Sequence, residues 1–296
     1  MTDKFRKPSC LYEPSRTAYH FSLMQQSQEI LVVTPTLGRS PWLEQTVDSV
    51  AQLMNAGSNL RHLLVTPSPE LNRLKAAFPD QEVIVEVPGK TGLYGAINTA
   101  ADSSDDWDWL TYVNDDDILR PDFGRVVEAA ANDLADVIYG RVSYIDAEGQ
   151  VLGAFPVESR PRRLASLMAA GIPPFTQQGT LVRRTCFDQL GGFDSQYPLA
   201  ADFDFWVRAV RAGISFRYLP VETGSFRLRK GQLSADQGRV RSEIETIIAT
   251  HLPRQGRLAR ARVQACFRLR HLPEILSRRM RTGHWRTAGS IGREEP

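Results

Sequence analysis

WDWLTYVNDDDIL, residues 107–119, decides the fold: an apolar, β-rich run is followed at once by Asn114 and three consecutive carboxylates, Asp115, Asp116 and Asp117. Three adjacent negative charges repel one another, so a folded chain must solvate them widely or neutralise them with a cation. Carboxylate oxygens on a loop suit Mg2+ or Mn2+, and such an ion also holds a diphosphate. Taken alone, the triplet is equally typical of a solvated acidic turn.

Strand-like and helix-like segments alternate on the N-terminal side of this stretch and through it. Ser40 is expected to cap the first helix, with Pro41 at its first position. The alternation predicts a parallel sheet covered on both faces, with ligands beyond the carboxyl ends of its strands. The expected pairs of strand and helix are 29–35 with 40–54, 61–66 with 69–78, 82–87 with 92–102, and 107–113 with 115–132.

The pattern changes after residue 135. Two β-rich runs surround the turn Asp-Ala-Glu-Gly at 146–149 and predict a hairpin. Helical segments are expected at 162–171, 183–192 and 201–213. We therefore predict an N-terminal arm (1–25), one domain (26–235) with a nucleotide-binding half (about 26–118) and an acceptor half (about 119–235), and a helical C-terminal region (236–296).

The C-terminal region is basic and amphipathic. Residues 251–296 hold eleven Arg and three Glu, so this part carries +8 and residues 1–250 carry −6. Pro273 is expected to divide it into two helices. Either the helices pack on the domain with solvated arginines, or they attach the protein to an anionic membrane surface. No recognised nucleic-acid module is present, so we expect no nucleic-acid partner. Helical spacing relates Leu258, Ala261, Ala265, Leu269, Leu272, Leu276 and Met280.

Composition sets further bounds. The chain of 296 residues is 42% hydrophobic, which suits a globular protein with a real core. Its three cysteines are far apart and form no CxxC pair. The N-terminus MTDKFRKPSC has no apolar core of signal-peptide length, and no apolar run approaches the roughly 18 residues that span a bilayer. These features predict a cytoplasmic protein.

Five short motifs resemble family 2 glycosyltransferases in order and approximate spacing: TPTLGR (34–39), GLYGAIN (92–98), NDDD (114–117), GGFD (191–194) and ADFDFWVR (201–208). The resemblance covers about residues 29–234. It implies a GT-A-type α/β fold, with a mostly parallel central sheet flanked by helices. It also implies inverting transfer of a sugar from a nucleotide diphosphate donor to a hydroxyl of a glycan or lipid-linked acceptor, as in bacterial cell-surface polysaccharide synthesis.

The resemblance also assigns residues to the donor site. The family's Asp-x-Asp motif holds Mn2+ or Mg2+, which points to Asp116 first and to Asp117 as a further metal ligand. The ion would stabilise charge on the leaving diphosphate. Nucleotide-sugar contacts are expected from Pro35, Thr36, Arg39, Thr66, Gly92, Ala96, Asn98, Asp115, Arg227 and Arg229.

The acceptor hydroxyl needs a base, because its own pKa is far too high for attack as a free alkoxide at neutral pH. By resemblance the base is Asp202, which would take the proton in a single displacement; the alternative use of this residue is as a helix N-cap. Asp204 is the competing candidate. The acceptor pocket is expected to include Gln177, Gln178, Asp204 and Trp206.

The sequence departs from the family pattern in two places. LLVTPSPE (63–70) stands where many members carry Asp-Asp-Gly-Ser, and Gly95 stands where Asp is frequent. Uracil recognition is therefore in doubt, and UDP, GDP and TDP donors stay open. A non-catalytic sugar-nucleotide-binding relative is the alternative, followed by a sugar nucleotidyltransferase, although TPTLGRSP lacks the glycine-rich basic loop expected of the latter.

Overall fold

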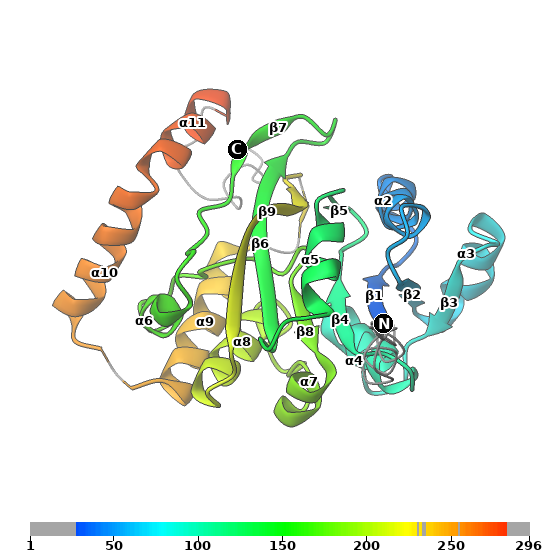
Figure 1. The fold of residues 1–296 in the computed structure, drawn as a ribbon, viewed down its shortest axis with the longest axis horizontal. Coiled ribbons are helices and arrows are strands. Elements are labelled where there is room, and N and C mark those ends of the chain that lie inside the picture. The colour runs from blue at the N-terminus through cyan, green and yellow to red at the C-terminus, as the bar shows by residue number, and fades with distance from the viewer. Residues whose placement is uncertain (1–27, 230, 233–234, 254, 283–296) are drawn as a thin grey trace, which may run out of the picture.

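The computed structural model describes residues 28–229, 231–232, 235–253 and 255–282, so the N-terminal arm (1–25) lies outside the described residues. Strands and helices alternate through the first half as expected (Figure 1). Its elements are β1 (Ile30–Pro35), α2 (Leu43–Asn55), β2 (Leu60–Thr66), η1 (Ser68–Glu70), α3 (Leu71–Ala77), β3 (Glu82–Val85), α4 (Gly92–Asp102), β4 (Trp109–Tyr112), β5 (Ile118–Leu119) and α5 (Phe123–Ala130).

The second half begins with the expected hairpin. Its elements are β6 (Val137–Ile145), β7 (Val151–Ala154), η2 (Pro161–Arg163), α6 (Leu164–Ala169), β8 (Leu181–Arg183), α7 (Arg184–Leu190), α8 (Ala201–Arg211), β9 (Phe216–Arg227), α9 (Gln237–His251), α10 (Arg257–Arg270) and α11 (Leu272–Thr282). The break between α10 and α11 falls at His271, two residues before Pro273, which confirms the division of the C-terminal segment.

One mostly parallel sheet organises the molecule, in the order β3-β2-β1-β4-β8-β6-β9-β5, with β7 paired to β6. Strand β8 runs antiparallel to both β4 and β6, and β9 runs parallel to β6. The carboxyl ends of β1, β4, β6 and β9 consequently meet at one edge of the sheet. This confirms the α/β architecture and places the loops after these four strands together.

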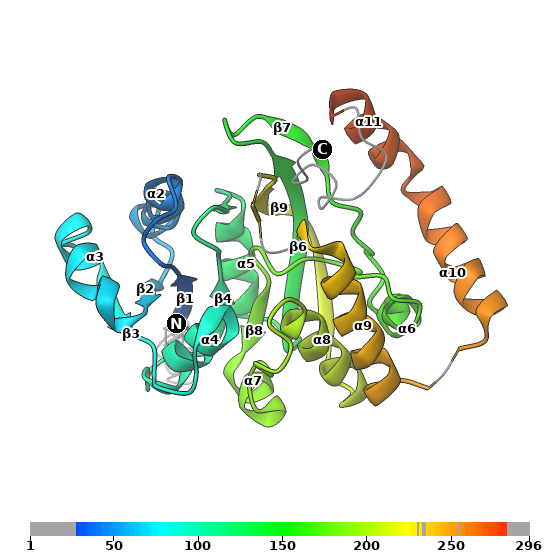
Figure 2. The ribbon, with the colours of Figure 1, turned by 180° about the vertical axis from the view of Figure 1, so that it is seen from behind.

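Helices cover both faces of the sheet. Side chains of α4, α6, α7, α8 and α9 form one hydrophobic cluster, whereas α2, α3 and α5 pack on the other face. Figure 2 shows the first face from the front. Ile247 of α9 is completely buried in the first cluster, so α9 packs into the core of the molecule.

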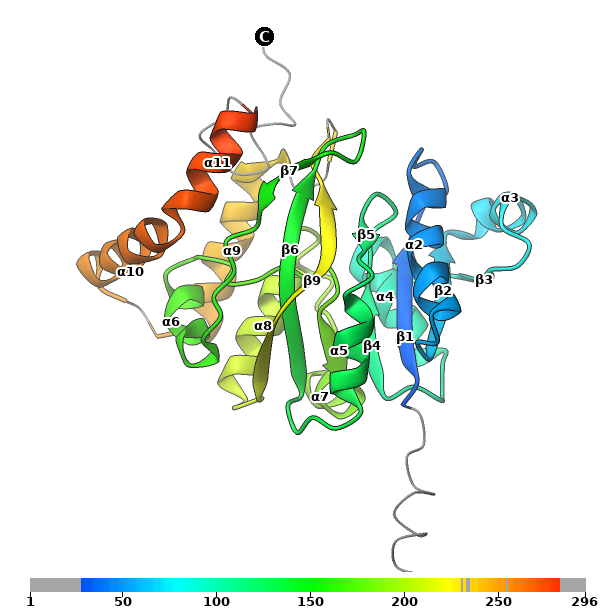
Figure 3. The same ribbon diagram turned by 45° about the horizontal axis from the view of Figure 1, so that its top comes forward.

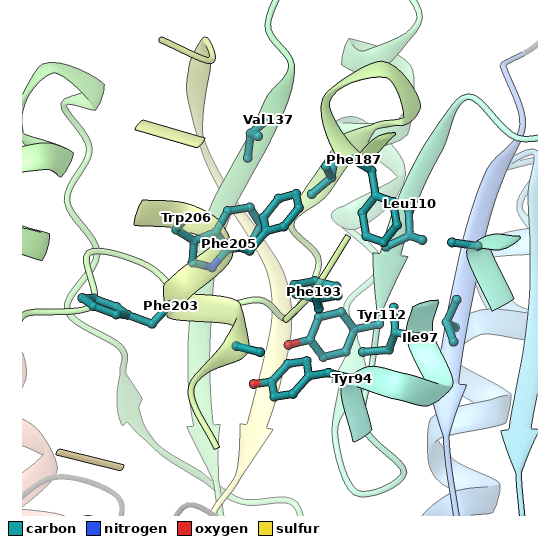
Figure 4. Packing of buried hydrophobic residues seen from close by; sticks show 14 of the residues in the cluster. Tyr94, Ile97, Leu110, Tyr112, Val137, Phe187, Phe193, Phe203, Phe205 and Trp206 are labelled. Atoms are coloured by element: carbon teal, nitrogen blue, oxygen red, sulfur yellow. The ribbon is translucent and has the colours of Figure 1, made fainter. Parts of the chain in front are cut away.

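An aromatic group joins α4, β4 and α8 within this core (Figure 4). The ring of Phe193 lies 5.4 Å from that of Tyr94, 5.6 Å from that of Tyr112 and 5.0 Å from that of Phe205. Rings at such separations and tilts pack favourably. The hydroxyl groups of Tyr94 and Tyr112 point to the same side of this group.

The first helix does not begin as expected. Helix α2 starts at Leu43 with Trp42 as N-cap residue, and no side chain caps it. Ser40 instead donates its hydroxyl to the backbone oxygen of Asp115 at 2.6 Å. The N-cap thus lies two residues beyond the predicted one, although the hydroxyl of Ser40 accepts a hydrogen bond from the backbone N–H of Trp42 at 3.3 Å. The same hydroxyl ties the loop after β1 to the acidic loop after β4.

Helices α10 and α11 lie along one side of the molecule, at the opposite end from α3 (Figures 1 and 3). Helix α10 contacts α6, and α11 contacts β7. Among the described residues, no helix has the length and apolar character needed to cross a membrane.

Candidate active site

The three carboxylates of the acidic loop have separate partners. Asp115 accepts a hydrogen bond from the hydroxyl of Thr36 at 2.6 Å, which joins the loops after β4 and β1. Asp116 is buried and forms an ion pair with Arg229, whose Nε lies 2.5 Å from its Oδ2. Burial raises the pKa of Asp115, and the charge of Asp116 raises it further. The acidic triplet is therefore held inside the fold and is not a solvated turn.

Asp117 is the anchor of this loop. Its side chain is completely buried and accepts hydrogen bonds from the backbone N–H of Arg227 at 2.8 Å, Nε2 of Gln178 at 2.8 Å and Nδ2 of Asn114 at 3.0 Å. Burial, and next the charge of Asp116, hold the pKa of Asp117 well above its usual range. The carboxylate of Asp117 is thus used in hydrogen bonds inside the protein, whereas the sequence predicted that it binds the metal ion.

Arg227 is likewise buried, next to the acidic loop. Its side chain is completely buried, and its guanidinium donates to the carbonyl oxygens of Asp116 and of residues 146–147, and to Oε1 of Gln45. The guanidinium also lies 5.2 Å from the ring centroid of Trp42. These contacts hold the loop after β4, the turn after β6 and helix α2 together at the carboxyl edge of the sheet. Arg227 is not placed to clamp a diphosphate, because its donors are used inside the protein.

Arg229 is more exposed than Arg227 and pairs with Asp116. Its side chain is about a quarter exposed, and its guanidinium lies 5.6 Å from the ring of Trp42, which sequence reasoning had not singled out. An arginine fork suits diphosphate oxygens. The contact of Arg229 with the diphosphate stays a prediction, and the ring of Trp42 packs against its guanidinium.

The residues around Asp116 fit a divalent cation. No group of three or more His, Cys, Asp or Glu side chains in the described part of the chain is spaced to enclose a metal ion. Mg2+ needs less, because it is bound through one or two carboxylates, with waters and substrate phosphates completing the shell. Asp116 and Asp115 supply two carboxylates. The buried Oδ1 of Asn114 has no hydrogen-bond partner among the described residues, so it is a third oxygen next to them.

Asp202 lies on the first turn of α8. Its Oδ1 accepts hydrogen bonds from the backbone N–H of Phe203 at 2.7 Å and from the hydroxyl of Tyr94 at 3.1 Å. Burial raises the pKa of Asp202, and these hydrogen bonds oppose the rise. The N-cap residue of α8 is Ala200, so Asp202 does not cap the helix. Both hydrogen bonds from described residues go to Oδ1, which leaves Oδ2 for a substrate.

Tyr112 connects Asp202 with the acidic loop. It is the last residue of β4, two residues before Asn114, and its ring lies 6.4 Å from that of Tyr94. Burial raises the pKa of Tyr112 well above its usual range, and the charges of both Asp202 and Asp117 contribute to the rise. Tyr94 thus contacts the candidate base through its hydroxyl and, through its ring, the tyrosine that ends the strand before the acidic loop. Neither tyrosine was predicted from the sequence as a site residue. The signals that could have found them are the aromatic residue within GLYGAIN and the one at the end of β4.

Asp204 lies elsewhere. Its carboxylate is completely buried and pairs with Arg208 at 2.6 Å and with His251 of α9 at 3.1 Å. Arg208 also donates to the backbone oxygens of Leu190 and Gly192 at the end of α7. Residues two apart on a helix face different directions. The structure therefore does not bring Asp204 together with Asp202. Its contacts with Arg208 and His251 link α8 to α7 and α9.

The expected acceptor residues divide into two kinds. Gln178 donates a hydrogen bond to Asp117 and is buried beside it. Gln177 and Trp206 are also buried, but both amide atoms of Gln177 and Nε1 of Trp206 lack hydrogen-bond partners among the described residues. The ring of Trp206, one turn beyond Asp202, lies 5.0 Å from that of Phe175. Unpaired buried polar atoms are costly, so these atoms are candidates for a polar ligand.

The expected donor residues of the first two loops lie at strand ends. Pro35 ends β1, and Thr66 ends β2 with a buried hydroxyl that has no partner among the described residues. Arg39 is exposed and pairs with Glu70 at 2.7 Å, and Arg73 donates to the loop carbonyl oxygens at Leu37 and Gly38. These contacts fix the shape of TPTLGR.

Helix α4 presents its expected donor residues differently. Gly92, at its first position, is exposed and has a φ of +81°, which glycine adopts without strain. Ala96 is completely buried in the core. Asn98 exchanges two hydrogen bonds with the backbone of Phe193, so its amide joins α4 to the GGFD loop. A Cβ at Gly95 would lie 2.4 Å from a backbone carbon of Lys90, which explains the absence of a side chain there.

The family model for glycosyltransferase-like family 2 matches residues 27–268. The chain belongs to this family. A comparison with curated protein sequences finds no match. Solved structures of glycosyltransferases share the fold at low sequence identity.

TarS of S. aureus superposes with a TM-score of 0.56 at 13% identity, covering 83% of this chain and 44% of TarS. This chain thus spans less than half the length of that protein. A mannosyltransferase of Pyrobaculum calidifontis in complex with GDP-Man and Mn2+ has a TM-score of 0.51 at 17% identity, covering 88% of this chain and 73% of that one. Glucosyl-3-phosphoglycerate synthase of Mycobacterium tuberculosis, with Mg2+ and UDP, has a TM-score of 0.50 at 14% identity, covering 83% and 88%.

Proposed function

We propose that this chain transfers a sugar from a nucleotide diphosphate donor to a hydroxyl of a glycan or lipid-linked acceptor, with inversion, at the cytoplasmic face of a cell membrane. The observation that carries the proposal is the convergence of two carboxylate groups from distant segments. Tyr94 donates a hydrogen bond to Asp202 on α8, and its ring lies 6.4 Å from that of Tyr112, which ends β4 two residues before Asn114 and the acidic loop. Membership of the family supports glycosyl transfer as the reaction.

The donor would bind across the carboxyl ends of β1 and β4. Asp116 and Asp115 would hold Mg2+ or Mn2+, with the oxygen of Asn114 beside them. A bound ion of this kind stabilises negative charge on a leaving diphosphate. Arg229, steadied by Trp42, would contact the diphosphate oxygens, and Thr36 would keep Asp115 in place. Asp117 and Arg227 hold the loop from below.

Asp202 would act as the base. Tyr94 and the backbone of Phe203 hold Oδ1. Oδ2 would take the proton of the acceptor hydroxyl as the hydroxyl oxygen attacks the anomeric carbon. The bond from that carbon to the diphosphate breaks in the same step. Gln177 and Trp206 would bind acceptor hydroxyls through their unpaired polar atoms. Bacterial cell-surface polysaccharide synthesis is the process in which we place this reaction.

Calorimetric titration tests the donor site. UDP, GDP and TDP are each titrated with and without Mn2+ into the wild type, Asp116→Ala and a control, Asp122→Ala, which removes an exposed acid on α5's N-terminal side. We expect one nucleotide to bind in a metal-dependent manner, with binding lost in Asp116→Ala and kept in the control. Failure of all three nucleotides to bind would refute the proposal and favour a relative without a donor site.

A further inference from the structure

The apolar stripe of the C-terminal helices points away from the protein. Five of the ten large hydrophobic side chains exposed in the described part of the chain lie on α10 and α11. Leu258 is 88% exposed, Leu269 70% and Met280 82%, and Leu272 and Leu276 are partly exposed between them. The steps from Leu258 to Leu269 and from Leu272 to Met280 keep these side chains on one face of each helix. We refer to these five residues as the outer stripe.

The opposite face of α10 docks on the domain mainly through polar groups. Arg260 and Gln264 donate to the backbone oxygen of Ala170, and Arg270 pairs at 2.9 Å with Glu158, which is almost completely buried. Phe267 supplies the buried apolar contact on this face. The helix is therefore fixed in an orientation that presents its leucines to the outside.

Helix α11 is held in the same way. Arg278 is buried with its guanidinium 5.2 Å from the ring of Tyr144, and a Cβ at Gly153 of β7 would lie 3.2 Å from its own Cβ. Arg281 donates to the backbone oxygen of Val151 at 3.0 Å. Specific arginine contacts hold both helices to the domain, so the exposure of the outer stripe does not come from loose or inverted packing of one helix.

Positive charge surrounds the outer stripe. Residues 257–282 contain eight arginines and one glutamate. Arg257, Arg262 and Arg268 are exposed, and Arg262 lies four residues after Leu258 and seven before Leu269, within the stripe itself. Helices with apolar side chains and arginine on one exposed surface lie in the interface of anionic membranes, with apolar groups at the acyl boundary and cations among the headgroups.

We propose that the outer stripe of α10 and α11, with Arg257, Arg262 and Arg268, is a docking surface for an anionic lipid bilayer. A second copy of this chain is a poorer partner, because a two-fold contact through the stripe would bring these arginines against their own copies. A nucleic acid would use the arginines and leave the leucines in water. An anionic bilayer offers its acyl region to the leucines and its charged headgroups to the arginines.

The α11 end of the docking surface lies at the same edge of the sheet as the candidate active site, whereas α10 extends away from it toward α6. Helix α11 lies beside β7 in both Figures 1 and 3, and β7 is joined to β6 by the turn whose residues 146–147 accept hydrogen bonds from Arg227. A bilayer on α11 would therefore meet acceptors near the site. The docking itself does not depend on the proposed glycosyl transfer, because it uses none of the site residues.

Vesicle flotation of the full chain tests this surface. Vesicles of phosphatidylcholine alone are compared with vesicles that contain about 30% phosphatidylglycerol. The stripe variant is Leu258→Ser/Leu269→Ser/Met280→Ser, and its control is Leu134→Ser, which removes a leucine that is 95% exposed outside the stripe. The charge variant is Arg262→Glu/Arg268→Glu, and its control is Lys75→Glu/Arg125→Glu, an equal change of charge at exposed positions on α3 and α5.

We expect the wild type and both controls to float with the anionic vesicles, and the stripe and charge variants each to bind about tenfold more weakly or worse. All substituted side chains are exposed, so the variants should keep the wild-type thermal midpoint. Absence of flotation of the wild type, or equal binding by the stripe variant and Leu134→Ser, would overturn the proposal. A wild-type dimer that the stripe variant converts to a monomer would assign the surface to a second copy. Nucleotide titration of the same samples reports separately on the donor site.

Discussion

Replacement of Asp117 by alanine should lower the free energy of unfolding far more than replacement of Asp115 by alanine. The carboxylate of Asp117 accepts three buried hydrogen bonds, from Arg227, Gln178 and Asn114. The alanine variant leaves these three donors without a partner, and each buried donor left unpaired costs about 1–3 kcal/mol. Relief of the buried charge and of its repulsion by Asp116 offsets part of this cost. We expect a net loss of about 3–5 kcal/mol.

Asp115→Ala is the matched control. Asp115 lies in the same loop, but it is only partly buried and accepts one side-chain hydrogen bond, from Thr36. Water can replace its carboxylate for that hydroxyl, so we expect a loss of about 1 kcal/mol. A domain's total stability is about 5–15 kcal/mol, which makes the difference between the two variants easy to resolve.

Urea unfolding at neutral pH without nucleotide measures both free energies. The slope of the unfolding free energy against urea should stay unchanged, since the fold is the same in each variant. A loss in Asp117→Ala no larger than that in Asp115→Ala would refute the anchoring role. If Asp117→Ala instead kept its stability and lost metal-dependent nucleotide binding, Asp117 would be the metal ligand that the sequence suggested.

Three further variants test the base and the C-terminal docking. Asp202→Asn should lower kcat by roughly 100-fold to 10,000-fold and leave the nucleotide Kd unchanged, as calorimetry and initial rates will show. Activity should fall as the pH drops through the raised pKa of Asp202, because the protonated carboxyl group cannot act as a base. Tyr94→Phe removes a hydrogen bond that lowers this pKa, so it should move the acidic limb of the kcat/KM profile to higher pH. An unchanged limb would contradict that role for Tyr94. Glu158→Ala should cost about 3 kcal/mol, because it removes the buried carboxylate that pairs with Arg160, Arg163 and Arg270. Loss of the pair with Arg270 should also expose α10 to limited proteolysis, whereas the exposed Glu245→Ala should behave like wild type.

The alternation of strands and helices was readable from the sequence because each segment carries its own period. Helix α2 and strand β1 show this, since local spacing alone separates them. The order of the second half was not readable. Strand β8 has only three residues and runs against β4, and β9 pairs with β6 about 80 residues earlier. Such pairings depend on the whole sheet, and a short segment holds no local trace of them.

The site was predicted as a location rather than as an arrangement. The acidic triplet marks a loop at the carboxyl edge of the sheet, but three adjacent acids look alike in sequence. Their partners come from distant elements: Thr36 for Asp115, Arg229 for Asp116 and the backbone of Arg227 for Asp117. The side chain of Arg227 shows the same limit. A basic residue after the last strand reads as a diphosphate clamp, and only the fold reveals that loop carbonyl groups surround it.

The C-terminal helices show what periodicity can and cannot decide. Spacing correctly places Leu258 and Leu269 on one face of α10, and a face of this kind normally packs on its own domain. Here the contacts of Arg260, Gln264 and Arg270 with the domain turn that face outward. An apolar face held outward by specific polar contacts loses the burial that would otherwise stabilise it. The described fold therefore leaves this stripe uncovered, and the proposed contact with an anionic bilayer would supply the missing apolar partner.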